Sequence, residues 1–210
     1  QVGNEWRAGM DLHKGTGLML VFNAERHEYL LNGALLPNVT RILADLMDLS
    51  MIAPAALEIA RQKGAAIHKM VELWAKGDLD LDTLPEWMAP VLVEWRKFVS
   101  QSGFKVVDSE KRVCHPQYRY AGTLDLFGVM HSGAAYIDVK RSFLGGNVIA
   151  LQLAAYQGAD AYENKDRRSA KRYALRLKEG EPFRLQEYSN PNDFNVFTAC
   201  LIRHQWKGQQ

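Results

Sequence analysis

The sequence predicts an α/β fold in which a mixed β-sheet is flanked by helices. Two long segments, residues 54–77 and 85–103, repeat their apolar residues with the helical period. After Gly103 the apolar period drops to two, as in strands, and a helical segment at residues 146–165 interrupts the strand-like stretches. Strands joined both by tight turns and by a helix favour a mixed sheet with helices packed on it.

The elements follow in order along the chain. Residues 18–37 predict two short strands with a polar turn, the second ending at Gly33, and residues 38–48 predict a first helix. The helix over residues 54–77 has Pro54 in its first turn and Gly77 at its C-terminal stop. The expected strands of the main sheet are residues 104–115, 123–130, 134–142, 172–180 and 183–188. A last helix is expected around Phe194, Phe197 and Leu201.

Composition limits the classes of protein that this chain can represent. A length of 210 residues predicts one domain over residues 18–210, preceded by a leader or added segment at residues 1–17. The net charge of +2 restricts any nucleic-acid surface to a local patch. Two distant cysteines fit a reducing cytoplasm and exclude a disulfide framework. Because no apolar run approaches the roughly 18 residues of a membrane span, we expect a soluble protein without membrane contact.

The stretch AGTLDLFGVMHSGAAYIDVKRS places charged residues on an expected hairpin. Asp138 and Lys140 are two residues apart on a strand and therefore share a face. With Ser132 and Gly133 at the centre of the turn, Asp125 lies opposite Lys140, whereas a three-residue loop would reverse that parity. An ordinary solvated face with ion pairing is the alternative. However, Asp138 follows an apolar run, and a buried carboxylate needs a partner or a metal. Two carboxylates and a backbone carbonyl suit Mg²⁺ or Mn²⁺.

Four short motifs together resemble a known superfamily. They are Gly64-Ala-Ala-Ile-His68, Gly122-Thr-Leu-Asp125, Asp138-Val-Lys140 and Gln152-Leu-Ala-Ala-Tyr156. In this order the sequence resembles the PD-(D/E)XK nucleases, most closely the RecB-like branch with phage and mitochondrial-genome-maintenance exonucleases. The resemblance covers about Val39 to Leu201. It implies a restriction-endonuclease-like core and a Mg²⁺- or Mn²⁺-dependent DNA exonuclease of phage or bacterial recombination, repair or replication.

The resemblance also implies roles for residues of the hairpin. Asp125 and Asp138 match the two carboxylates that bind metal in the family, and the carbonyl of Val139 is expected as a further ligand. Lys140 matches the catalytic lysine, which positions the attacking water. Hydrolysis would then proceed by in-line attack without a covalent intermediate.

Further site residues come from the neighbouring elements. His68 matches the helical histidine that completes the metal shell, although a histidine on an apolar face is often a core residue. Its neighbour Gly64 predicts a close approach of this helix to the sheet. Glu110 is a candidate additional ligand or part of an exposed charged edge. Gln152 and Tyr156 match the motif beside the catalytic site, and their spacing of four puts them on one helix face; the alternative is an amphipathic helix with incidental polar groups.

Arg141, which could touch phosphate, is a candidate for DNA contact. Arg119, Tyr120 and Arg61 are further candidates, for which a plain surface residue is the favoured alternative. The expected partner is DNA with free ends, single- or double-stranded, together with a recombination or single-strand-binding protein. Two cysteines are too few for the iron-sulfur cluster of some relatives, so no cluster is expected. The chain also lacks the phosphate loop of helicase-fused members.

Two other functions remain open for this sequence. One is a non-hydrolytic DNA-binding or assembly module on the same fold, against which the intact acidic pair and lysine argue. The other is a structure-specific or site-specific endonuclease. A site-specific enzyme would call for a base-reading region, and the chain shows no candidate for one.

Overall fold

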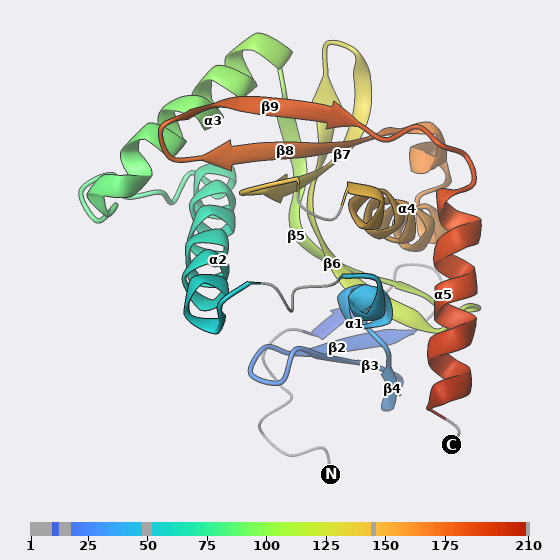
Figure 1. Cartoon of the computed structure of the whole chain (residues 1–210). Coiled ribbons are helices and arrows are strands. Elements are labelled where there is room, and N and C mark those ends of the chain that lie inside the picture. The colour runs from blue at the N-terminus through green and yellow to red at the C-terminus, as the bar shows by residue number, and fades with distance from the viewer. Residues whose placement is uncertain (1–9, 13–17, 48–51, 144–145, 209–210) are drawn as a thin grey trace.

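The protein is built around a five-stranded mixed sheet (Figure 1). A computed structural model describes residues 10–12, 18–47, 52–143 and 146–208. The strands lie in the order β5-β6-β7-β8-β9, and within this sheet β7 and β8 are parallel while the other neighbours are antiparallel. The strands are β5 (Lys105–His115), β6 (Tyr120–Met130), β7 (Gly133–Lys140), β8 (Lys171–Lys178) and β9 (Glu181–Glu187). The predicted α/β class with a mixed sheet is confirmed.

Helices cover both faces of this sheet (Figure 1). One face carries α2 (Pro54–Lys76) and α3 (Ala89–Ser102), and the other carries α1 (Val39–Leu43), α4 (Gly146–Glu163) and α5 (Asp193–Lys207). Short 3-10 turns lie at Ala44–Leu46, Glu86–Met88 and Lys165–Ser169. Along β7, Tyr136 packs toward α4, whereas Ile137 and Val139 pack toward α2 and α3. The alternation of side chains along a strand therefore directs Asp138 and Lys140 to the α4 side.

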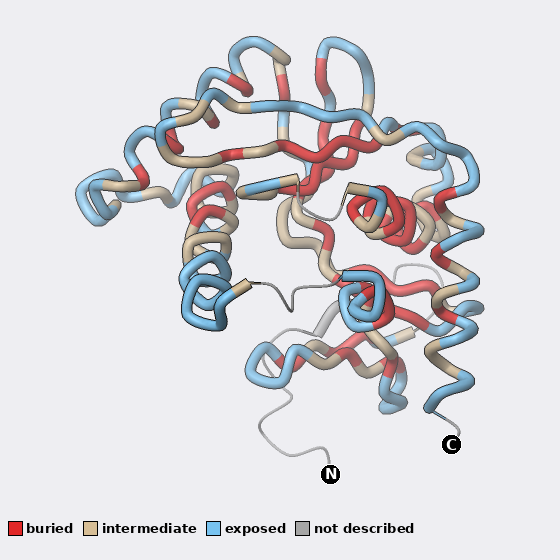
Figure 2. The backbone as a smooth tube through the Cα atoms, in the orientation of Figure 1, coloured by how far each residue is buried: buried red, intermediate tan, exposed pale blue. Residues whose placement is uncertain are grey.

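The helix ends lie where the sequence predicts them. Pro54 occupies the first turn of α2, and Gly77 ends it with a left-handed φ of 76°. Gly103 ends α3 in the same way, with a φ of 66°. Figure 2 shows that the first half of α2 is exposed and that α4 is buried along most of its length. Among the described residues, no helix is both long enough and apolar enough to cross a membrane.

A second, four-stranded antiparallel sheet corrects the expectation for residues 18–37. It comprises β1 (Met10–Leu12), β2 (Met19–Asn23), β3 (Glu28–Leu31) and β4 (Ala34–Leu36). The second expected strand does end at a tight turn, formed by Asn32 and Gly33 with φ of 50° and 82°, but a further strand, β4, follows this turn before Pro37. Of the segment at residues 1–17, the structure describes 10–12, which pair with β2; the rest lies outside the described residues.

The hairpin formed by β6 and β7 has a different register from the predicted one. Met130 pairs with Gly133, so His131 and Ser132 form the turn, and the expected pairing of Asp125 with Lys140 is wrong. The ladder between the strands stops at Leu126 and Ile137, although β7 continues to Lys140. The strands β6 and β7 therefore separate beside the residues that the sequence marks as functional.

Candidate metal centre

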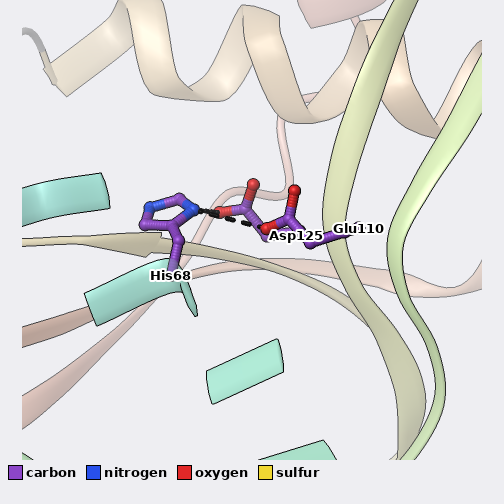
Figure 3. Close-up of side chains that lie close together, drawn as sticks. All are labelled: His68, Glu110 and Asp125. Atoms are coloured by element: carbon purple, nitrogen blue, oxygen red, sulfur yellow. Dashed lines mark ion pairs between the residues drawn. The ribbon is translucent and has the colours of Figure 1, made fainter. Parts of the chain in front are cut away.

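Three side chains from three elements point toward one another where β6 and β7 separate. They are His68 of α2, Glu110 of β5 and Asp125 of β6 (Figure 3). His68 Nδ1 lies 3.5 Å from Asp125 Oδ2 and 3.7 Å from Glu110 Oε1. One ligand atom from each residue lies within 4.8 Å of the others. The spacing of these atoms is suitable for binding a single metal ion.

Backbone groups of Val139 orient two of these side chains. Val139 N donates to Asp125 Oδ2 at 2.7 Å, and His68 Nε2 lies 2.8 Å from Val139 O. Because a carbonyl oxygen only accepts, Nε2 must carry the hydrogen, and Nδ1 is the atom that faces the carboxylates. A histidine whose second nitrogen donates to a backbone carbonyl is held in the orientation typical of a metal ligand. Val139 O, expected as a ligand, accepts this hydrogen bond from His68.

The carboxylates determine the charge of His68. Burial lowers the pKa of the ring, but the charges of Asp125 and Glu110 outweigh burial and raise the pKa of His68 to about 9. At neutral pH without metal, the ring is therefore a cation between two anions. A metal ion binding at Nδ1 has to displace a proton from it.

Glu110 has a strained backbone. Its φ is 48°, a left-handed value that costs a residue with a side chain of this kind roughly 1–2 kcal/mol. The pairs Ser109 with Leu126 and Lys111 with Leu124 place Glu110 beside Asp125 on the neighbouring strand. Strain of this kind is concentrated at functional sites. Glu110 lies on the edge strand β5 with its side chain 34% exposed, and it is also one of the three side chains that converge with His68 and Asp125.

Asp138, which is buried, and Lys140, which is partly buried, form a separate ion pair next to these three side chains. Lys140 Nζ lies 2.8 Å from Asp138 Oδ2, and the exposed fraction of the Asp138 side chain is 2%. Neither Asp138 oxygen has a hydrogen-bond partner within the described part of the chain, apart from this ion pair. Burial raises the pKa of Asp138 despite the nearby Lys140, and Asp125 raises it further. Asp138 was expected with Asp125 in one metal shell, but it is not among the three convergent ligands.

Lys140 keeps its proton in this environment. Burial lowers the pKa of its amine, but the charges of Asp138 and Asp125 outweigh burial and raise it above the ordinary value. A lysine that stays charged cannot act as a general base at neutral pH. It can instead donate hydrogen bonds and stabilise negative charge.

Gln152 and Tyr156 lie together on α4, as their spacing predicts. Gln152 Nε2 donates to Tyr156 Oη at 3.1 Å. Tyr156 is buried, and burial followed by the charges of Asp138 and Asp125 raises its pKa well above the ordinary value. A Cβ at Gly122 would lie 2.5 Å from Tyr156 Cε1. The glycine of the G-x-x-D motif thus makes room for this tyrosine.

Two expectations about contacts are wrong. Tyr120 was a candidate for DNA contact, but its side chain is fully buried and its hydroxyl donates to the carbonyl of Ala155 at 2.8 Å. Gly64 was expected to let α2 approach the sheet closely, but a Cβ built there meets no atom within 4 Å. Gly64 instead lines an open pocket of about 490 Å³ in front of the metal centre, together with His68 and Glu110.

The expected arginines are dispersed over the structure. Arg61 lines the same 490 Å³ pocket and forms two hydrogen bonds to Glu58, at 2.7 and 2.8 Å. Arg141 directly follows β7, and its Nε is buried without a hydrogen-bond partner among the described residues. Arg119 lies in the turn between β5 and β6 and lines a different pocket.

No family model matches this sequence, and no curated protein was found to match it. The function of this protein is therefore inferred from the residues of the centre. Two carboxylates and one imidazole can bind a divalent cation, and a buried carboxylate with a charged lysine lies on the adjacent strand. This arrangement is suited to hydrolysis at an anionic substrate.

Proposed function

We propose that the protein is a metal-dependent nuclease that hydrolyses phosphodiester bonds of DNA, on a core of the restriction-endonuclease type. The observation that carries this proposal is the position of His68, Glu110 and Asp125 beside the ion pair of the buried Asp138 with Lys140. A structural ion pair alone would not require an imidazole and two further carboxylates at the same point. The resemblance to PD-(D/E)XK nucleases supports the same activity.

The donor set of the centre fits a hard divalent cation. His68, Glu110 and Asp125 would hold Mg²⁺ or Mn²⁺, and the Asp138 oxygens, which accept no hydrogen bond from the described residues apart from the ion pair with Lys140, could accept one further contact. When bound, the cation neutralises charge on the phosphate and lowers the pKa of a bound water. The imidazole ligand favours Mn²⁺ over Mg²⁺, because Mg²⁺ prefers oxygen donors throughout.

The chain's own residues supply orientation and charge. The charged Lys140 orients the attacking water and stabilises the negative charge that develops on the phosphate. Asp138 holds Lys140 in place through the 2.8 Å ion pair. The hydrogen bond to Val139 O keeps the His68 ring directed at the carboxylates. Gln152 and Tyr156, hydrogen-bonded to each other on α4, lie on the side of the centre that faces this helix.

We further propose that DNA is degraded from its ends, as in the exonucleases that the sequence resembles. The substrate would approach through the open pocket along α2 that Arg61, Gly64 and Lys69 line. A strand end can enter there without the base-reading contacts that a site-specific enzyme needs.

The test compares purified wild type, Lys140→Met and a control, Lys97→Met, on end-labelled linear and circular DNA. Lys97 also forms an ion pair, with Glu94 at 2.5 Å on α3, so its removal reproduces the loss of a paired lysine elsewhere. We expect Mn²⁺- or Mg²⁺-dependent release of nucleotides from linear DNA by wild type and Lys97→Met, and none in EDTA. Lys140→Met should lose cleavage while it still binds DNA. Cleavage in EDTA, or full activity of folded Lys140→Met, would contradict the nuclease assignment. Digestion of circles as fast as linear strands would contradict only the requirement for ends.

A further inference from the structure

A pocket of about 750 Å³ lies apart from the metal centre and shares no lining residue with it. Its walls come from the β2–β3 turn, the segment from β4 into α1, the β5–β6 turn and the C-terminal end of α5. Figure 1 shows α1 between α2, which carries His68, and α5.

The lining of this pocket is strongly basic. Arg26, Arg41 and Arg119 are exposed there, and none of them forms an ion pair with another described residue. His27 and His204 add two imidazoles, and Glu28 is the single acidic residue among the described residues of the lining. The neighbouring cations of α5 differ, because Arg203 and Lys207 both pair with Asp45, at 3.1 and 2.6 Å. Among the described residues, the charges of these three arginines are not balanced by an ion pair, which leaves positive charge in the lining for a ligand to neutralise.

Hydrogen bonds between the wall segments hold this pocket in shape. Asn38 Nδ2 donates to the carbonyl of His27 at 3.2 Å, which links α1 to the β2–β3 turn. Ala121 N donates to Pro37 O at 3.1 Å, and Gln205 Nε2 donates to Tyr118 O at 3.3 Å. These bonds link the small sheet, the β5–β6 turn and α5. The arginines are thus carried on backbone segments whose relative positions are fixed.

Arg119 is held in an unfavourable backbone conformation. Its φ is 56°, in the left-handed region where glycine is preferred, and its N–H donates to His115 O at 2.8 Å. A glycine would relieve the conformation but would remove the guanidinium. An arginine at such a position does not favour stability, and its exposed guanidinium is available for binding.

We propose that this pocket binds phosphate groups of a nucleic-acid strand, as an anchoring site separate from the metal centre. Guanidinium groups match phosphate oxygens in a forked geometry, and three of them around one hollow suit a ligand with several negative charges. The choice of nucleic acid as the ligand rests on the proposed function. The pocket would hold part of the substrate beyond the bond being cleaved.

The experiment measures the affinity of a fluorescent single-stranded 30-mer in EDTA at several salt concentrations, so that cleavage does not contribute. The variants are Arg41→Ala and Arg119→Gly, with Arg96→Ala, an exposed arginine of α3, as the matched control. We expect each pocket variant to bind about tenfold more weakly, the loss of one hydrogen-bonded charge. The slope of log K against log salt should also become smaller by about 0.7 per lost phosphate contact. Arg119→Gly should melt no lower than wild type, because glycine adopts the left-handed backbone freely.

The outcomes separate this proposal from the nuclease assignment. Unchanged affinity and salt slope in both pocket variants would overturn the anchoring site, whatever the cleavage assays show. A thermal shift by inorganic pyrophosphate that Arg41→Ala abolishes, with unchanged affinity for the 30-mer, would also overturn it and assign the pocket to a small anion. Weaker binding with a smaller slope supports the site even if the protein cleaves nothing.

Discussion

Replacing His68 by glutamine should uncouple metal binding from pH. The ring of His68 lies between Asp125 and Glu110, whose charges outweigh burial and raise its pKa to about 9. A metal ion can bind at Nδ1 only after that nitrogen has lost its proton. Metal affinity in wild type should therefore increase with pH until His68 is neutral, and it should lose this dependence in His68→Gln.

The size of the effect follows from the distance between the working pH and the pKa. The pKa of the ring lies about two pH units above pH 7. Displacing its proton at pH 7 therefore costs about 3 kcal/mol, which lowers the metal affinity about a hundredfold. The stability of the metal-free protein changes in the opposite direction. Because the folded pKa is raised, the protonated ring stabilises the fold below pH 6.5, and this contribution is lost as the pH rises through about 9.

Isothermal titration of Mn²⁺ into metal-free protein, in buffers with different heats of protonation, measures both affinity and proton release. We expect wild type to release about one proton per metal at pH 7 and His68→Gln to release none. His131→Gln, at the exposed turn between β6 and β7, is the matched control and should behave as wild type. Equal proton release from wild type and His68→Gln would refute the assignment of Nδ1 as a ligand.

Three further predictions concern stability and are checked by urea unfolding in EDTA. The free energy of unfolding of Lys140→Met should be about 3 kcal/mol lower than that of wild type, because Asp138 is left buried without its cation. The double variant Asp138→Leu/Lys140→Met should recover most of this free energy, and an equal loss in both variants would contradict the ion-pair argument. Gly122→Ala should lower the free energy of unfolding by about 1–3 kcal/mol, because the added Cβ lies 2.5 Å from the Tyr156 ring. Gly64→Ala, with free space around it, should raise the free energy of unfolding by up to about 1 kcal/mol. A change in the same direction in both variants would refute this reasoning. Burial lowers the pKa of His115 to about 4, so between pH 6.5 and 4 the imidazole is protonated in the unfolded chain but neutral in the folded protein. The free energy of unfolding should therefore decrease by up to about 3 kcal/mol as the pH falls from 6.5 to 4. In His115→Phe this decrease should be smaller.

Local patterns in the sequence determined the elements and part of the site. The helical period together with Pro54 and Gly77 is enough to define α2, because capping depends on neighbouring residues alone. The period of two places Asp138 and Lys140 on one face of β7 in any register. The pairing of these two residues is therefore a property of the sequence.

The tertiary structure alone decided which residues meet at the centre. Glu110 and Asp125 become neighbours through the register of β5 and β6. His68 approaches them from α2, although it lies 42 and 57 residues away along the chain. The end of the β6–β7 ladder, which leaves Val139 to bond with Asp125 and His68, has no local signature. The 750 Å³ pocket also has no local signature in the sequence, because its walls come from four separate segments. Contacts between distant segments depend on strand register and on which faces are buried, and both are settled only when the whole core packs.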